Sequence, residues 1–189
     1  MRRWVIFFTE RLYQMVNWKG VAVAVLVFAG FIAWVLPRQA SLSESASGSG
    51  ESPDSSLWYT SADLYRIAEI YGEEGRAHYI EARFTFDVIW PLVYLGFLTI
   101  ALTAAYVFLS SGSRWRAVNL LPLGGWGFDW LENLGSSLVM YRYPARTLVI
   151  AEMTPIFTLI KWCLIYASFG ALVVGIVLSV LHRFRKKRS

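Results

Sequence analysis

The sequence predicts an all-α membrane protein: a bundle of four transmembrane helices with short amphipathic helices on its outer face and an interfacial helix at its N-terminus. Hydrophobic residues make up 56% of the 189 residues and charged residues only 16%, well below the roughly 25% usual in soluble domains. The mean hydropathy of +0.45 agrees with this. A bilayer core takes about 20 mostly apolar residues per helix, so we expect several spans and no separate soluble domain.

The N-terminal part, 1–36, is predicted to be a membrane anchor. In 2–16, apolar side chains recur at helical spacing with charged residues between them, the pattern of a short helix that lies on the membrane surface. The first span follows over 18–36, and Pro37 is expected to stop it. A secretory signal peptide is the alternative, but the long charged segment before the apolar run and the lack of an A-x-A site before Ser41 argue against it.

The next segment, 37–57, is rich in Ser and Gly. Such low-complexity sequence cannot bury a core, so we interpret it as a flexible linker. Helical patterning returns at Thr60, which has the spacing of a capping pair with Asp63, and Gly72 is expected to end this first amphipathic helix. A second amphipathic helix should run from there into the second span.

Residues 58–189 are predicted to form a polar-cored unit of three spans, followed by a basic C-terminal tail. A turn at Tyr143-Pro144 separates the last two spans, which should therefore be antiparallel neighbours. The three expected spans are 88–109, 117–140 and 148–181.

The distribution of Lys and Arg predicts the orientation, because basic residues concentrate on the cytoplasmic side. With the N-terminus inside, eleven basic residues lie on the inner side and six on the outer side. The sequence thus predicts a multi-pass protein of the inner (plasma) membrane with both termini cytoplasmic and the 37–86 loop extracytoplasmic. The inner residues are Arg2, Arg3, Arg11, Lys19, Arg114, Arg116, Arg183, Arg185, Lys186, Lys187 and Arg188; the outer ones are Arg38, Arg66, Arg76, Arg83, Arg142 and Arg146. Basic ends of this kind fit anionic lipid as a partner better than nucleic acid.

The third span carries the most informative pattern. At 100° per residue its polar side chains fall within about a third of the circumference, and leucines occupy the rest. The polar face comprises Pro122, Gly125, Asp129, Glu132, Asn133, Ser136 and Met140. A lone charge at such depth costs about 2.5–3.5 kcal/mol on insertion scales, so the two acids need a partner.

The fourth span supplies that partner. Lys161 is the one basic residue within any predicted span, and it shares a face with Thr154 and Thr158. We therefore expect an ion pair of Lys161 with Glu132 or Asp129. Directly before the second span, Arg83 and Asp87 form an i,i+4 pair on the face that continues to Pro91 and Tyr94.

These residues predict a binding site in the outer half of the three-span unit, open to the outside, for a small molecule or lipid headgroup. The candidate ligand-binding residues are Asp87, Tyr94, Asp129, Glu132, Asn133 and Lys161. Three alternatives remain open: an ion-pair network that only fixes helix register, a membrane enzyme that uses paired carboxylates on a lipid, and a structural subunit of a larger membrane complex.

Several kinds of chemistry are disfavoured. The two histidines, His78 and His182, lie outside the spans, which argues against an intramembrane zinc or haem site, and no cofactor is expected. The lone cysteine, Cys163, allows no intramolecular disulfide and is expected to be a small core residue. The segment Gly125-Trp126-Gly127-Phe128-Asp129 has one residue too many for the G-x-G-D motif of presenilin-type proteases. A lipid isomerase of the sterol isomerase and sigma-2 receptor kind is an analogy of fold alone.

Four short motifs carry a resemblance that covers about 58–181. They are Asp87-x3-Pro91-x2-Tyr94, Phe128-Asp129-x2-Glu132-Asn133, Tyr143-Pro144 and Lys161-Trp162. In these motifs the chain resembles a group of small, functionally uncharacterised four-span bacterial integral membrane proteins. The resemblance implies the fold and no particular activity.

Overall fold

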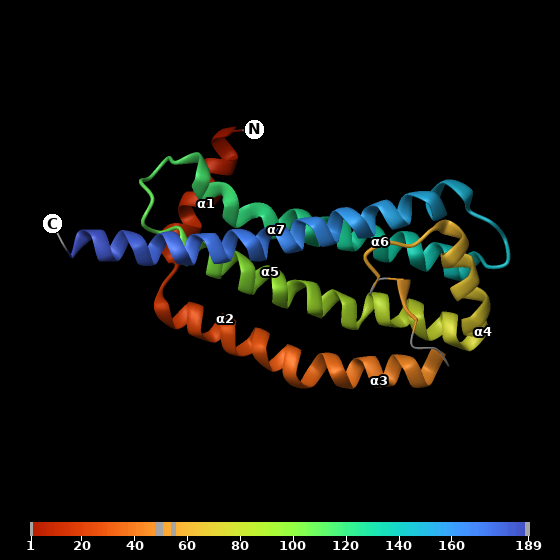
Figure 1. Cartoon of the computed structure of the whole chain (residues 1–189). Coiled ribbons are helices and arrows are strands. Elements are labelled where there is room, and N and C mark those ends of the chain that lie inside the picture. The colour runs from red at the N-terminus through yellow and green to blue at the C-terminus, as the bar shows by residue number, and fades with distance from the viewer. Residues whose placement is uncertain (1, 48–50, 54–55, 188–189) are drawn as a thin grey trace. The chain divides into compact units, whose positions relative to one another are not determined.

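The computed structural model describes residues 2–47, 51–53 and 56–187, and Figure 1 traces their helices. Most of these residues are helical and none is in a strand, so the all-α prediction is confirmed. In this part of the chain, three helical stretches are long and apolar enough to cross a membrane. They are Trp18–Ser45, Ser61–Ala105 and Leu148–Lys186.

The chain begins with helix α1, Arg2–Met15, close to the predicted 2–16. Two of its side chains, Thr9 and Tyr13, are buried, whereas Phe7, Phe8 and Met15 are at least half exposed. One face of the helix therefore packs against protein, whereas an apolar part of its surface is exposed. An interfacial helix needs such an exposed apolar surface.

The first apolar helix continues further than predicted. Helix α2 (Trp18–Gly30) passes through the π-helical turn η1 (Phe31–Val35) into α3 (Leu36–Ser47). The expected stop at Pro37 is therefore wrong, and helix occupies the first part of the predicted linker 37–57.

The π-helical turn explains why Pro37 does not end the helix. Inside an α-helix a proline ring clashes with the carbonyl four residues earlier and leaves one carbonyl without a donor. In this turn the N–H of Leu36 bonds instead to the carbonyl of Phe31, five residues back. The wider turn just before the proline leaves room for its ring. Parts of the predicted linker, 48–50 and 54–55, lie outside the described residues.

Helix α4 (Ser61–Phe84) begins as the sequence predicts. The Thr60 hydroxyl accepts the N–H of Asp63, whose carboxylate in turn accepts the N–H of Thr60, which completes a capping box. The helix breaks at Gly72, where φ is 62°, a left-handed conformation that glycine adopts without penalty. The predicted end of the first amphipathic helix at Gly72 is thus confirmed.

Helix α5 (Phe86–Ala105) follows after Thr85 and continues through Pro91. The chain then enters a short 3-10 helix, η3 (Arg114–Leu120). The expected second span, 88–109, thus ends four residues later than α5 does.

The last two long helices are α6 (Leu121–Arg142) and α7 (Leu148–Lys186). The predicted turn lies between them, and its Tyr143-Pro144 peptide bond is cis. Helix α6 corresponds to the predicted third span, 117–140. Its acids, amide and glycines make it less apolar than the three stretches that meet the length and hydropathy expected of a span.

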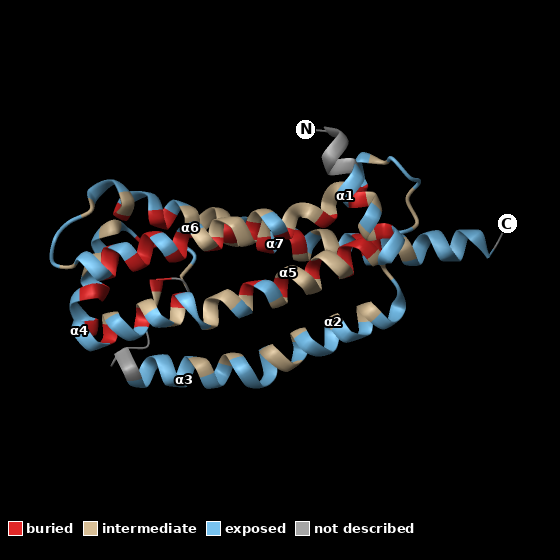
Figure 2. Cartoon of the chain, turned by 180° about the vertical axis from the view of Figure 1, so that it is seen from behind, coloured by how far each residue is buried: buried red, intermediate tan, exposed pale blue. Residues whose placement is uncertain are grey.

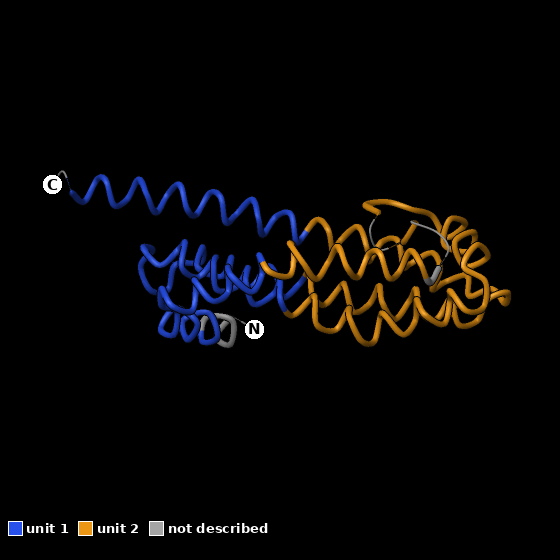
Figure 3. The backbone as a smooth tube through the Cα atoms, turned by 90° about the horizontal axis from the view of Figure 1, so that it is seen from below, with its two compact units in different colours: residues 1–29, 93–124, 164–189 blue, residues 30–92, 125–163 orange. Residues whose placement is uncertain are grey.

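Two compact units divide the chain, and Figure 3 colours them separately. Unit 1 comprises residues 1–29, 93–124 and 164–189; unit 2 comprises residues 30–92 and 125–163. The units predicted from the sequence are each one continuous stretch of the chain. In the structure, α5, α6 and α7 are instead each divided between the two units.

Unit 1 has a small core built around Tyr106. Its buried members are Tyr13, Leu102, Ala105 and Tyr106. The Tyr106 hydroxyl donates to the carbonyl of Ala171 at 3.0 Å, and a Cβ added to Gly175 would overlap the Tyr106 ring. Glycine at 175 thus allows α7 to approach α5 closely in this unit.

Unit 2 has the larger core, which gathers residues of α4, α6 and α7. Its buried members are Tyr59, Leu64, Ile67, Ala68, Tyr71, Tyr79, Val139, Met140 and Ala151. The apolar stripe predicted for the first amphipathic helix therefore packs into this core.

Much apolar surface remains exposed on the long helices (Figure 2). None of the residues of α2 is buried. In the last turns of α7, Val173, Ile176 and Leu181 are each about half exposed. Exposed apolar surface of this extent on a helix is what lipid covers in a membrane.

Candidate functional site

The polar face predicted for α6 is buried in the structure. Asp129, Glu132, Asn133 and Ser136 are each at most 8% exposed. The leucines of the opposite face are between 39% and 50% exposed; they are Leu123, Leu131, Leu134 and Leu138. Helical spacing alone thus identified which side of α6 faces protein.

Lys161 of α7 lies between two carboxylates of α6. Its ammonium contacts the Glu132 carboxylate and lies 3.4 Å from Oδ1 of Asp129. Asn133 completes the cluster, because its amide Nδ2 donates to Oδ2 of Asp129 at 3.5 Å. The predicted ion pair is confirmed. Lys161 contacts both Glu132 and Asp129, which the sequence predicted as alternative partners. We call Asp129, Glu132, Asn133 and Lys161 the ion cluster.

Small and hydroxylated side chains hold α6 and α7 together next to the ion cluster. A Cβ on Gly135 would overlap the hydroxyl of Thr154, so the backbone of α6 runs directly against this threonine. Thr158, one turn further along α7, donates to the Thr154 carbonyl at 3.1 Å. Its hydroxyl also shares a 3.0 Å hydrogen bond with Tyr59. These contacts fix the register that places Lys161 beside the acids of α6.

A second buried ion pair joins the end of α4 to the start of α5. Arg83 Nε lies 2.7 Å from Oδ2 of Asp87, which confirms the predicted i,i+4 pair. The guanidinium of Arg83 also lies over the ring of Tyr79, 4.4 Å from its centroid. Both charged side chains are at most 13% exposed, so the pair is largely removed from solvent.

The sixth predicted residue, Tyr94, is buried at 4% exposure. It belongs to unit 1, whereas the five others belong to unit 2. The site built from unit 2 therefore comprises Asp87 and the ion cluster, and the participation of Tyr94 stays a prediction.

The ion pairs of unit 2 fall into two groups. Asp87 pairs with Arg83, and the carboxylates of Asp129 and Glu132 both contact the ammonium of Lys161. Of these two acids Asp129 is the more exposed, at 11% against 0% for Glu132.

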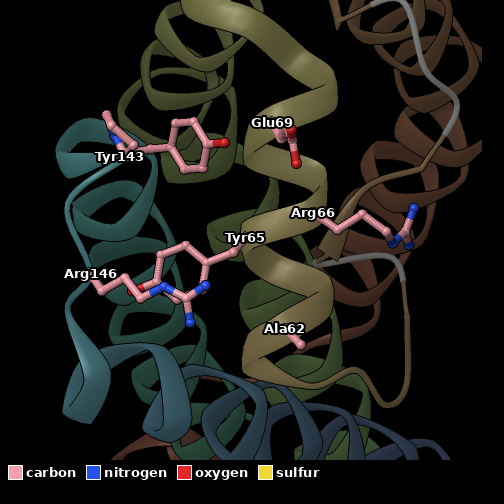
Figure 4. A pocket seen from close by; sticks show the side chains of 7 residues that line it. Ala62, Tyr65, Arg66, Glu69, Tyr143 and Arg146 are labelled. Atoms are coloured by element: carbon pink, nitrogen blue, oxygen red, sulfur yellow. The ribbon is translucent and has the colours of Figure 1, made fainter.

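A hollow of about 400 Å³ lies elsewhere in unit 2, between α4 and the turn that follows α6 (Figure 4). None of the six predicted residues lines it. Its lining residues are Ala62, Tyr65, Arg66, Glu69, Tyr143, Pro144 and Arg146. The i,i+4 spacing of Tyr65 and Glu69 could have indicated one wall, but the opposing turn is distant in sequence.

Cys163 lies near the ion cluster in sequence but not on the same face of α7. Cys163 is exposed, so its prediction as a core residue is wrong. It follows Lys161 by two positions, about 200° around the helix, and therefore faces away from the ion cluster. Among the described residues, no group of three or more His, Cys, Asp or Glu is placed to hold a metal ion.

Comparison with known proteins yields no relative. No protein-family model matches the chain, and no match was found among curated proteins or solved structures. The resemblance to small four-span bacterial membrane proteins therefore stays a prediction, and functional inference rests on the residues of this chain.

Proposed function

We propose that the chain is a four-span inner-membrane protein that binds an ammonium-bearing small molecule or lipid headgroup from the outer side. Three apolar helical stretches and α6 would supply the spans. The exposed leucines of α6 support its insertion as the fourth, because its polar face is already covered by protein. The excess of Lys and Arg near the termini supports cytoplasmic ends.

The arrangement of two carboxylates around the Lys161 ammonium supports the binding proposal. Ionisable residues at membrane depth are costly and often mark ligand or ion pathways. Asp129 keeps some exposure whereas Glu132 has none, so a cationic ligand would approach the cluster at Asp129. A primary ammonium can satisfy a carboxylate by both charge and hydrogen bonds.

Exposure separates the roles of the two acids. The Glu132 side chain is 0% exposed, whereas that of Asp129 is 11% exposed and stands further from the lysine. Glu132 then acts as the permanent partner of Lys161, and Asp129 as the carboxylate that a ligand reaches. Asn133 positions Asp129 through its amide.

Thermal unfolding of the detergent-solubilised full chain in methylammonium chloride tests this proposal, with sodium chloride at equal ionic strength as reference. We expect methylammonium to raise the unfolding midpoint of the wild type and to lose this effect in Asp129→Asn. Glu74→Gln, which removes an exposed carboxylate of α4, is the matched control and should respond as the wild type does. Equal midpoints in the two salts for the wild type would refute the proposal.

The second candidate is a structural subunit, and complete burial of Glu132 against Lys161 favours it. A buried pair kept only for register can be replaced by apolar residues without loss of stability. The combined replacement of Glu132 and Lys161 by Leu, together with Asp129→Asn, distinguishes the two functions. If this charge-free protein assembles with the same partners in native membranes as the wild type does, the structural function is favoured.

A further inference from the structure

The hollow of unit 2 has the dimensions and position of a site for a small polar group. Its volume of about 400 Å³ falls at the lower end of the roughly 300–1,000 Å³ of small-molecule pockets. It lies where α6 ends and α7 begins. Because α7 is one of the stretches apolar enough to span a membrane, its first residues mark the depth at which lipid headgroups lie.

Arg146 presents a fixed guanidinium at this hollow. The guanidinium lies over the ring of Tyr65, 5.3 Å from its centroid. The Tyr65 hydroxyl accepts the N–H of Thr147 at 2.7 Å, so the ring is tied to the segment that carries Arg146. Within the described residues no carboxylate is paired with Arg146. A guanidinium held in this way can bind a phosphate through two parallel hydrogen bonds.

Glu69 presents the opposite charge. Figure 4 shows the Tyr143 hydroxyl directed toward the part of α4 that carries Glu69. Arg66 also lines the hollow, but its guanidinium pairs with the Glu51 carboxylate at 2.8 Å. The Arg76 guanidinium lies over the Tyr143 ring and donates to the Ala68 carbonyl. For Glu69 itself, the described part of the chain contains no paired cation. The hollow therefore offers one open cation and one open anion.

Apolar residues adjoin the charged ones. Leu148 and Val149, two and three positions after Arg146, are 64% and 74% exposed. Both residues lie at the start of α7. The hydrocarbon part of a ligand bound at Arg146 would therefore lie next to their apolar side chains. This favours a membrane lipid over a water-soluble compound.

We propose that this hollow binds the phosphoethanolamine headgroup of a phospholipid. The phosphate pairs with Arg146, the primary ammonium pairs with Glu69, and the acyl chains lie along Leu148 and Val149. The site uses none of the residues of the ion cluster, so it goes beyond the function proposed above.

The two charges also predict which headgroups are excluded. An ethanolamine ammonium carries three N–H donors for the Glu69 carboxylate, whereas a choline headgroup carries none. A glycerol headgroup has no cation, and its lipid leaves Glu69 uncompensated. Because Glu69 is exposed and an exposed ion pair contributes only modestly, ethanolamine lipid should bind several-fold more tightly than lipids of the other two classes.

Native mass spectrometry of the full chain in detergent tests this inference, with ethanolamine, choline and glycerol phospholipids of identical acyl chains. The wild type should retain the ethanolamine lipid preferentially. Arg146→Gln should lower the retention of all three lipids several-fold, and Glu69→Gln should remove the preference for ethanolamine over glycerol lipid. Arg142→Gln is the matched control and should behave as the wild type does, because Arg142 is an exposed arginine at the end of α6 that does not line the hollow.

Several outcomes would overturn the inference. They are unchanged retention in Arg146→Gln, an unchanged preference in Glu69→Gln, and binding of free phosphoethanolamine without retention of any lipid. Displacement of the bound lipid by free phosphoethanolamine would instead support recognition through the headgroup.

Arg146→Lys, which keeps the charge but not the paired donors, should give intermediate retention. This variant replaces Arg146→Gln in the test if Arg146→Gln does not fold. Asp129→Asn should retain ethanolamine lipid normally, which separates this test from that of the ion cluster.

Discussion

Gly135 of α6 lies against the side chain of Thr154 of α7 with no room for another atom between them. A Cβ on Gly135 would overlap the threonine hydroxyl and lie 3.5 Å from its methyl carbon. Thr154 cannot turn aside freely, because its hydroxyl donates to the Ile150 carbonyl at 2.7 Å. Glu132 lies one turn before Gly135 in α6, and Lys161 lies two turns after Thr154 in α7. The ion pair therefore depends on the close approach of the two helices at this contact.

Gly135→Ala is therefore expected to destabilise the protein by about 1–3 kcal/mol, the usual cost of overpacking. The free energy of unfolding in detergent measures this. Gly127→Ala is the control, because a Cβ at Gly127 meets nothing within 4 Å, and alanine favours helix over glycine by about 1 kcal/mol. If the two variants have equal stability, the Gly135–Thr154 contact does not set the helix spacing.

The same contact predicts a rescue. Thr154→Ala removes the hydroxyl and the methyl group that a Cβ at Gly135 would meet and leaves only the Thr154 Cβ position, 3.4 Å away, so it should restore most of the stability lost in Gly135→Ala. A double-mutant cycle of the two substitutions measures this coupling, which is expected to be about 0.5–3 kcal/mol for residues in contact. Additive effects would contradict direct contact.

Lys161→Met should be among the most damaging single substitutions in unit 2. It leaves two buried carboxylates, Asp129 and Glu132, without the ammonium that both contact, and loss of one partner of a buried pair costs about 3–5 kcal/mol. The yield of folded protein and the thermal unfolding midpoint should both fall. Adding Glu132→Gln and Asp129→Asn to this variant should restore most of the loss; failure of that rescue would mean that the lysine acts by its shape rather than by its charge.

Helical periodicity predicted correctly which polar residues of α6 share its buried face. The spacing of Asp129, Glu132 and Asn133 placed them together, and a short turn made Lys161 their neighbour. Periodicity could not predict that Tyr94 belongs to a different compact unit from these residues, because the division of α5 arises from the packing of other segments.

Two misjudged features of the fold have local physical causes. Pro37 was expected to end a helix, but a single π-helical turn before it accommodates the ring. The hollow at Arg146 was missed because its two walls, α4 and the turn after α6, are about 80 residues apart in sequence. Contacts over such separations leave no periodic signal in a single sequence.

In unit 1, Glu10 should hold α1 against the segment that precedes α6. Its carboxylate accepts the Gly112 N–H at 3.1 Å and pairs with the Arg116 guanidinium at 2.7 Å. Glu10→Ala removes both contacts and should destabilise this region by about 1–3 kcal/mol, because it leaves Arg116 buried without its acid. Limited proteolysis between α5 and η3 should become faster; Arg11→Ala, an exposed change on the same helix, should leave the cleavage rate unchanged.

Tyr13 should make the folded state sensitive to alkaline pH. Burial raises the pKa of its phenol to about 12, against the opposing effect of the Arg116 guanidinium, which lies 3.6 Å from the ring centroid. In the unfolded chain the phenol titrates near 10. Above pH 10 the unfolded state therefore loses its proton first, so the contribution of Tyr13 to stability is fully present below pH 10 and is lost as pH rises toward 12.

Tyr13→Phe tests this pH dependence. The variant loses the hydrogen bond from the hydroxyl to the Arg116 carbonyl, 3.2 Å long, so at neutral pH it should be less stable by about 1 kcal/mol. The difference from the wild type should shrink between pH 10 and pH 12, because only the wild type has this phenol to ionise. Tyr141→Phe removes a tyrosine that is 78% exposed and should follow the wild type across the whole range. Tyrosinate absorbance under native conditions supplies a second readout. Tyr13→Phe should remove one late-titrating group, and loss of an early-titrating group in this variant would show that Tyr13 is open to solvent.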